Sequence, residues 1–72
     1  MNGNELLRKL RRLATACAVE LMVDRRHGKG SHVTLRFGGR KTTLKDLKKE
    51  IGPGLLRAML NDIGLTRRDL DE

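Results

Sequence analysis

The stretch that decides the fold runs Lys29-Gly30-Ser31-His32-Val33-Thr34-Leu35-Arg36-Phe37. Every second residue from Val33 to Phe37 is apolar, and this period of two is typical of a strand with one buried face. His32 shares its parity with Thr34 and Arg36, so we expect the imidazole on the polar side of the sheet. The glycine in front of the strand predicts a turn that leads into it.

The surroundings of His32 are strongly cationic. Nine Lys or Arg residues lie between Arg25 and Lys49, against the single acid Asp46. Imidazole is the side chain best suited to proton transfer near neutral pH, and among cations it is well placed to act on a phosphodiester. The alternative is a merely solvated residue, the commoner fate of a lone histidine on the polar face of a strand. His27, in the turn, has weaker support as a proton partner or phosphate contact.

Two further segments are expected to complete an antiparallel sheet. Apolar residues alternate with others from Val19 to Asp24, and residues 26–30, which include two glycines, are expected to form a turn. This segment and the strand that follows therefore predict a hairpin. Gly38 and Gly39 turn the chain again, and residues 40–44 are short enough to be a third strand at the edge.

An amphipathic helix is predicted at the N-terminus, with Asn2 or Asn4 as its cap and Glu5 in its first turn. Its apolar residues recur every three or four positions and form one stripe: Leu6, Leu7, Leu10, Leu13, Ala14 and Cys17. Four basic residues lie mostly outside this stripe: Arg8, Lys9, Arg11 and Arg12. They form either a solvated face or a contact surface for phosphate or a partner.

Gly52-Pro53-Gly54 predicts the start of another helix, because proline is tolerated at the first helical position. Gly64 would end this helix, and Thr66 and Asp69 have the capping-box spacing that starts one last turn. The apolar face would consist of Leu55, Leu56, Met59, Leu60 and Ile63. Residues 44–51 fit either one or two helical turns or a charged loop.

The order helix, three strands, helix predicts an α+β fold with two helices packed on one face of a three-stranded antiparallel sheet. Residues 1–72 are expected to form a single domain, with Cys17, Met22 and Met59 packed inside it. A chain this short buries only about 60% of its unfolded surface, so a partner would add stability.

Composition narrows the possible functions. The formal charge of +7 and the pI near 10.6 indicate a polyanion or an acidic protein as partner. Phe37 is the only aromatic residue, which argues against binding single strands by base stacking. We see no membrane-spanning run and no secretory signal, and one cysteine indicates a reducing cytoplasm. The carboxylates are scattered, so neither a metal site nor another cofactor is expected.

Three segments together resemble the HicA family of bacterial toxins, the small RNA-cleaving partners of HicB antitoxins. Lys29-Gly30-Ser31-His32 matches the family's Gly-Ser-His signature at the hairpin. Residues 54–60, Gly-Leu-Leu-Arg-Ala-Met-Leu, look like the family's Gly-Thr-Leu-Arg-x-Ile-Leu helix. Ile63-Gly64-Leu65-Thr66 fits the usual end of that helix, and the similarity in order and spacing extends over roughly residues 4–70.

The resemblance implies a fold like that of a double-stranded-RNA-binding domain and a catalytic role for His32. It further implies a type II toxin: an mRNA-cleaving endoribonuclease, active in the cytoplasm and monomeric within a complex with a HicB-like antitoxin. The chain departs from the family at Val33, where many members have a second histidine or a bulky residue. Leu44-Lys45-Asp46 also replaces a Val-Pro-His-like segment. Whether any second residue assists His32 therefore stays open.

Cleavage of RNA can proceed without a metal, because the 2′-hydroxyl is a built-in nucleophile. His32 would act as general base or general acid, a contribution typically worth ~10²–10⁴-fold in rate. Positive charge and hydrogen bonds near the phosphoryl oxygens would stabilise the transition state. The residues expected to bind RNA are Lys29, Gly30, Ser31, Arg36, Arg40 and Lys41.

Three other functions fit parts of this sequence. A non-catalytic module for double-stranded RNA or other nucleic acid would explain the fold and the charge equally well. A DNA-binding helix-turn-helix is suggested by residues 57–66, but the chain leaves under two turns for a recognition helix. Binding of an acidic protein could be the main role, and it is compatible with a toxin that an antitoxin covers.

Overall fold

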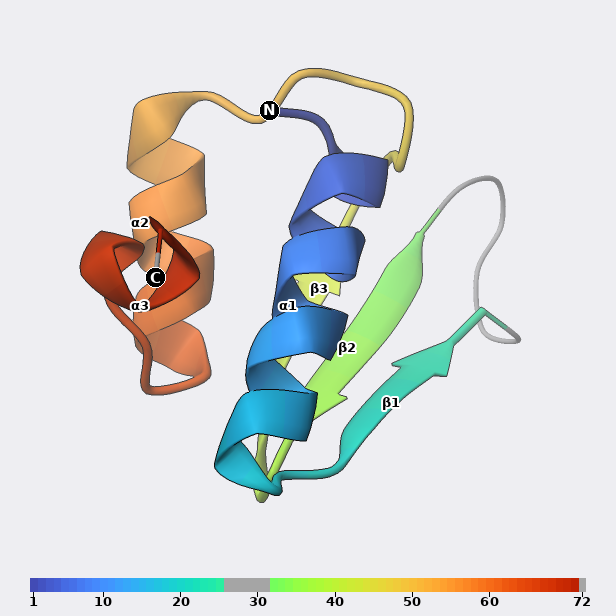
Figure 1. Cartoon of the computed structure of the whole chain (residues 1–72). Coiled ribbons are helices and arrows are strands. Elements are labelled where there is room, and N and C mark those ends of the chain that lie inside the picture. Colours follow the sequence, from blue (N-terminus) through green and yellow to red (C-terminus); the bar gives the residue numbers. More distant parts are fainter. Residues whose placement is uncertain (26–31, 72) are drawn as a thin grey trace.

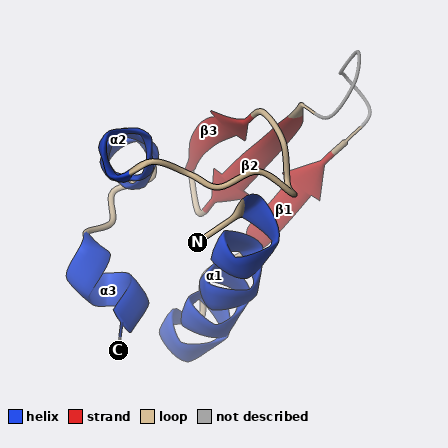
Figure 2. Cartoon of the chain, turned by 90° about the horizontal axis from the view of Figure 1, so that it is seen from above, coloured by secondary structure: helices blue, strands red, loops and turns tan. Residues whose placement is uncertain are grey.

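The computed structural model describes residues 1–25 and 32–71. Its elements, in order, are α1 (Gly3–Cys17), β1 (Leu21–Asp24), β2 (Val33–Phe37), β3 (Arg40–Leu44), α2 (Pro53–Asp62) and α3 (Arg67–Asp71). The strands form one antiparallel sheet with β2 in the middle; α1 covers one face of it, and α2 packs along β3 (Figure 1 and Figure 2). The predicted α+β class and the order helix, three strands, helix are confirmed, with α3 as the expected last turn.

Strand register separates an inner from an outer face of the sheet. Val23 pairs with Leu35, and Leu35 pairs with Thr42; this row faces the helices. The neighbouring row, in which Met22 and Lys41 flank Arg36, faces away from them. Strand β2 is therefore buried on its inner side only, as the alternation of its residues predicts.

Helix α1 begins with a capping box. The Asn2 side chain accepts a hydrogen bond from the Glu5 backbone N–H (2.9 Å), and Glu5 Oε1 accepts one from the Asn2 backbone N–H (3.2 Å). The buried side of α1 fills the core against β2, with Leu10 fully enclosed. The prediction that Cys17 packs in the core is wrong: the helix ends there, beyond the part that faces the sheet, and the thiol is exposed.

Helix α2 has the predicted start and end. Gly52 is its N-cap, Pro53 is its first residue, and Gly64 follows its end with φ of 77°, a conformation that favours glycine. The Thr42 hydroxyl donates a hydrogen bond to Asp62 Oδ2 (3.0 Å) and so ties β3 to this helix. Four of the five predicted apolar residues are buried: Leu56, Met59, Leu60 and Ile63.

Two further core predictions fail for geometric reasons. Leu55 is 50% exposed, because the buried side of α2 is narrow. That side contains Leu56, Met59 and Leu60, and Leu55 lies beside it. Met22 is 52% exposed, because its parity in β1 places it on the outer face beside Arg36. Met59, by contrast, is buried as expected.

The segment after β3 is a loop and contains no helix. The Lys48 backbone N–H donates to Asp46 Oδ1 (2.9 Å), and the Leu47 carbonyl accepts from the Asn4 backbone N–H (2.9 Å). Glu50 forms an ion pair with the terminal ammonium of Met1. This loop is therefore held against the start of α1.

Helix α3 begins with the predicted capping box. The Thr66 backbone N–H donates to Asp69 Oδ2 (2.8 Å), and the Asp69 backbone N–H donates to Thr66 Oγ1 (3.4 Å). The helix has five residues, and Leu70 anchors it in the core.

Replacement of Gly3 by alanine should destabilise the fold. A Cβ at Gly3 would lie 2.7 Å from both Leu44 Cδ2 and Leu47 Cα, so the loop backbone would have to move. We expect a loss of ~1–3 kcal/mol in the free energy of unfolding, the usual cost of overpacking. Gly54→Ala is the matched control, because Gly54 lies in the first turn of α2 with open space around it. Urea denaturation followed by circular dichroism measures both; equal stability of the two variants would contradict this packing.

Candidate functional site

His32 lies directly before β2 and is exposed to solvent. It lines an open hollow of about 310 Å³ together with Asp24, Thr34, Thr43 and Lys45. One residue further along β2, Val33 pairs with Leu44 of β3, so the continued register places His32 across from Lys45. The hollow is therefore built by three strands on the outer face of the sheet.

The floor of this hollow follows from the register. Asp24 pairs with Thr34, and Thr34 pairs with Thr43, so one side chain from each strand faces the same side. The next row along the sheet contains Arg36 and Lys41, both exposed. Together with Lys45, these residues put three cations on the face that carries the imidazole. Positive charge on an exposed face attracts a polyanion and raises its local concentration.

The residues predicted to bind RNA do not all lie on one face of the sheet. Arg36 and Lys41 lie on the outer face with His32. Arg40 does not: it pairs with the buried Phe37, and its side chain runs toward Gly64, where an added Cβ would be 3.4 Å from Arg40 Cδ. The other predicted residues lie outside the described part of the chain: Lys29, Gly30 and Ser31, together with His27.

Sequence reasoning missed four residues of the hollow: Asp24, Thr34, Thr43 and Lys45. The alternation of residues in β2 predicts that Thr34 lies on the polar face, but it indicates no role for this side chain. The signal that could have found the others is the hairpin register, since residues that pair across strands share a face. Lys45 stood out only as part of a charged segment, because its place opposite His32 depends on the length of the β2–β3 turn.

The hollow contains groups for proton transfer, for hydrogen bonding and for binding anions: an imidazole, two threonine hydroxyls and a lysine ammonium. Over residues 1–25 and 32–70, no three His, Cys, Asp or Glu side chains gather where they could hold a metal ion. Within the same ranges, no helix is long and apolar enough to cross a membrane.

Fold and site together define a small basic α+β domain whose element order is consistent with a fold like that of a double-stranded-RNA-binding domain, with an exposed histidine on the polar face of its sheet. The family model for the HicA toxin of bacterial toxin–antitoxin systems matches residues 18–65, two thirds of the 72-residue chain. The chain therefore belongs to the HicA toxin family. The matched part runs from the end of α1 to the residue after Gly64 and includes the whole hollow. No curated protein and no solved structure matches the chain.

Proposed function

We propose that this toxin is a metal-independent endoribonuclease that cleaves mRNA in the cytoplasm with His32 as its catalytic residue. The observation that supports this most directly is the exposed imidazole in an open hollow on a face with three cations. Membership of the HicA toxin family supports it as well, because the family is known for ribonuclease activity. A HicB-like antitoxin would neutralise the toxin, which would be monomeric within the complex.

The reaction requires one proton removed and one proton supplied. A base takes the proton from the 2′-hydroxyl, and the resulting oxygen attacks the adjacent phosphorus. The bond from phosphorus to the 5′-oxygen then breaks, and that oxygen takes up a proton from an acid. The products are a 2′,3′-cyclic phosphate and a free 5′-hydroxyl. His32 is the group suited to one of these two transfers, with water or a second side chain serving the other.

Lys45 is our candidate for stabilising negative charge on the phosphoryl oxygens. It shares the hollow with His32, and the strand register places it across from the imidazole. An ammonium next to developing negative charge lowers the barrier, because the charge is stronger in the transition state than in the bound substrate. The hydroxyls of Thr34 and Thr43 can donate hydrogen bonds to the same oxygens, while Arg36 and Lys41 would bind flanking phosphates.

The antitoxin would cover the outer face of the sheet. This face combines the three cations with the half-exposed side chain of Met22, so an acidic partner with an apolar residue at its centre would complement it. Such a partner would also stabilise the toxin, because it binds only the folded state.

The competing function is a non-catalytic RNA-binding module. It would use the same basic face but would leave the position of His32 without a role. An assay of purified protein with RNA in the presence of a chelator separates the two functions. RNA loss that persists with the chelator and depends on His32 supports the nuclease.

His32→Ala should reduce RNA cleavage by at least ~10²-fold while folding and RNA binding persist, because the exposed imidazole contributes acid–base chemistry and little packing. Single-turnover cleavage of a labelled RNA measures the rate, and circular dichroism checks the fold. An RNA with a 2′-deoxy sugar at the cleaved position should resist the parent protein. Cleavage by the Ala variant at the parent rate would rule out this mechanism.

Lys45→Ala should lower kcat by ~10–100-fold with a smaller change in KM, since its charge acts mainly on the transition state. Lys48→Ala is the matched control: Lys48 is an exposed lysine of the same loop that does not line the hollow. Lys45→Arg should recover part of the rate. Equal kcat values for the Lys45→Ala and Lys48→Ala proteins would exclude Lys45 from the reaction.

A saturating HicB-like antitoxin should displace RNA from the His32→Ala toxin, because both ligands would occupy the outer face of the sheet. Fluorescence anisotropy of a labelled RNA measures this competition. Met22→Asp should weaken antitoxin binding by about tenfold or more, since it removes an apolar contact and adds a charge that repels an acidic partner. A stable ternary complex of toxin, antitoxin and RNA would show that the antitoxin does not mask the site.

A further inference from the structure

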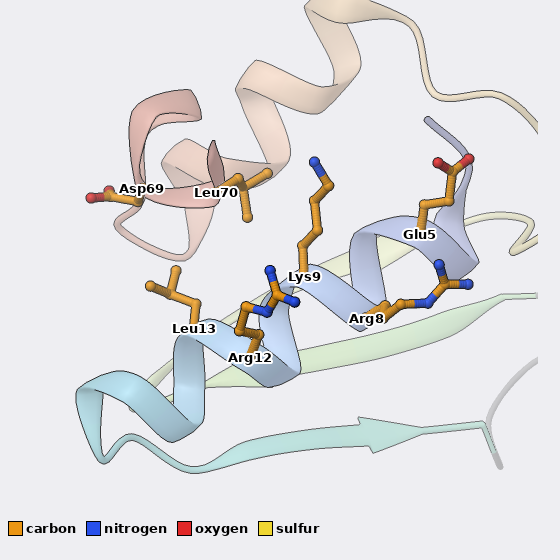
Figure 3. A pocket seen from close by; sticks show the side chains of 7 residues that line it. All are labelled: Glu5, Arg8, Lys9, Arg12, Leu13, Asp69 and Leu70. Atoms are coloured by element: carbon orange, nitrogen blue, oxygen red, sulfur yellow. The ribbon is translucent and has the colours of Figure 1, made fainter. Parts of the chain in front are cut away.

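A second basic hollow lies between α1 and α3, on the helical side of the molecule. Its volume is about 350 Å³, and Arg8, Lys9 and Arg12 of α1 line it. Figure 3 shows Lys9 and Arg12 extending from α1 into the space between the two helices, with Arg8 running along α1 toward its N-terminus. Leu13 and Leu70 supply its small apolar part.

The arginines of this hollow are available to a ligand. Arg8 and Arg12 are one helical turn apart on one side of α1, and both are exposed. Among the described residues, neither of them forms an ion pair. Two guanidinium groups with unfilled donors are suited to phosphate, which they bind with paired hydrogen bonds.

The two carboxylates that line the hollow belong to helix caps. Glu5 Oε1 accepts the Asn2 backbone N–H, and Asp69 Oδ2 accepts the backbone N–H and the hydroxyl of Thr66. In Figure 3 the Asp69 carboxylate points away from α1. These acids therefore hold the ends of α1 and α3 and form no ion pair with Arg8 or Arg12 among the described residues. With three cations against two carboxylates, the lining of the hollow keeps a net positive charge.

This hollow and the His32 hollow lie on opposite sides of the sheet. The buried side of α1 packs on the inner face of β2, whereas His32 lies on the outer face. The phosphates held by Arg8 and by Arg12 therefore cannot include the phosphate that is cleaved. A second segment of the same RNA can reach these arginines, because the molecule is only 18–23 Å across its two shorter axes.

We propose that the α1–α3 hollow binds the phosphate backbone of the substrate RNA away from the cleaved bond. This inference rests on the proposed ribonuclease function and adds to it a second binding surface. RNA is favoured over a protein ligand because the hollow offers cations with little exposed apolar area: Leu70 is buried and Leu13 is half-buried. The surface should increase affinity for long RNA and leave the chemistry at His32 unchanged.

The test measures binding of a labelled RNA to the His32→Ala protein, in which cleavage is absent. Arg8→Ala/Arg12→Ala in this background should raise Kd by about tenfold or more, the effect of two lost charged contacts. The slope of log Kd against log salt should fall by roughly 1.4, since each phosphate contact on a single strand contributes about 0.7. Arg11→Ala/Lys49→Ala is the matched control: it removes the same charge from exposed positions outside the hollow.

Cleavage by the protein that retains His32 provides a separate readout. Arg8→Ala/Arg12→Ala should raise KM and leave kcat unchanged, with an unaltered thermal transition by circular dichroism. Equal Kd values and salt slopes for the two double variants would overturn the inference, and so would a loss of antitoxin binding without a loss of RNA binding. Failure of the ribonuclease proposal looks different, because it appears as parent-level cleavage by His32→Ala while the Kd comparison still stands.

Discussion

The packing of the inner side of β2 against α1 is the contact on which the rest of the molecule depends. Leu35, fully buried, and Leu10 of α1 both lie in this core. Because side chains alternate along a strand, the burial of Val33, Leu35 and Phe37 forces Thr34 and Arg36 outward, and His32 with them. A slip of one residue would bury the polar set and expose the apolar one, so the core and the site share one register.

Most of the helices and strands could be predicted from the sequence, because the signals that define them lie within a few residues of each other. The alternation in β2, the capping residues Asn2 and Thr66, and the proline at the start of α2 each act within a few residues. The failures concern the edges of the core. Cys17 fits the apolar stripe of its helix, but periodicity does not show how far the opposite sheet extends beneath that stripe. Leu55 fits an apolar stripe as well, but periodicity does not show how narrow the buried part of that stripe is.

The candidate site was only partly predictable, because part of it depends on contacts between segments that are distant in the sequence. His32 stood out by residue type and setting, whereas Asp24 and Lys45 come near it only through pairing between strands. Arg40 illustrates the opposite error: it is basic and close in sequence to Lys41, yet alternation puts it on the other face, beside Phe37. The number of basic residues in a segment does not show on which face of the sheet each side chain lies. Only the cations on the same face as His32 can contact a ligand bound there.

The connection between β2 and β3 consists of only two residues, Gly38 and Gly39. Gly38 adopts φ of 63°, and its N–H donates to the Glu20 carbonyl at 2.9 Å, whereas nothing lies within 4 Å of a Cβ at Gly39. During divergence, the residue at position 39 is therefore free to change, but the length of this connection is not. An inserted residue that shifted the register of β3 by one would turn every β3 side chain to the opposite face and carry Lys45 out of reach of His32. A tight bend at the far end of the hairpin thus sets the composition of the hollow at the other end.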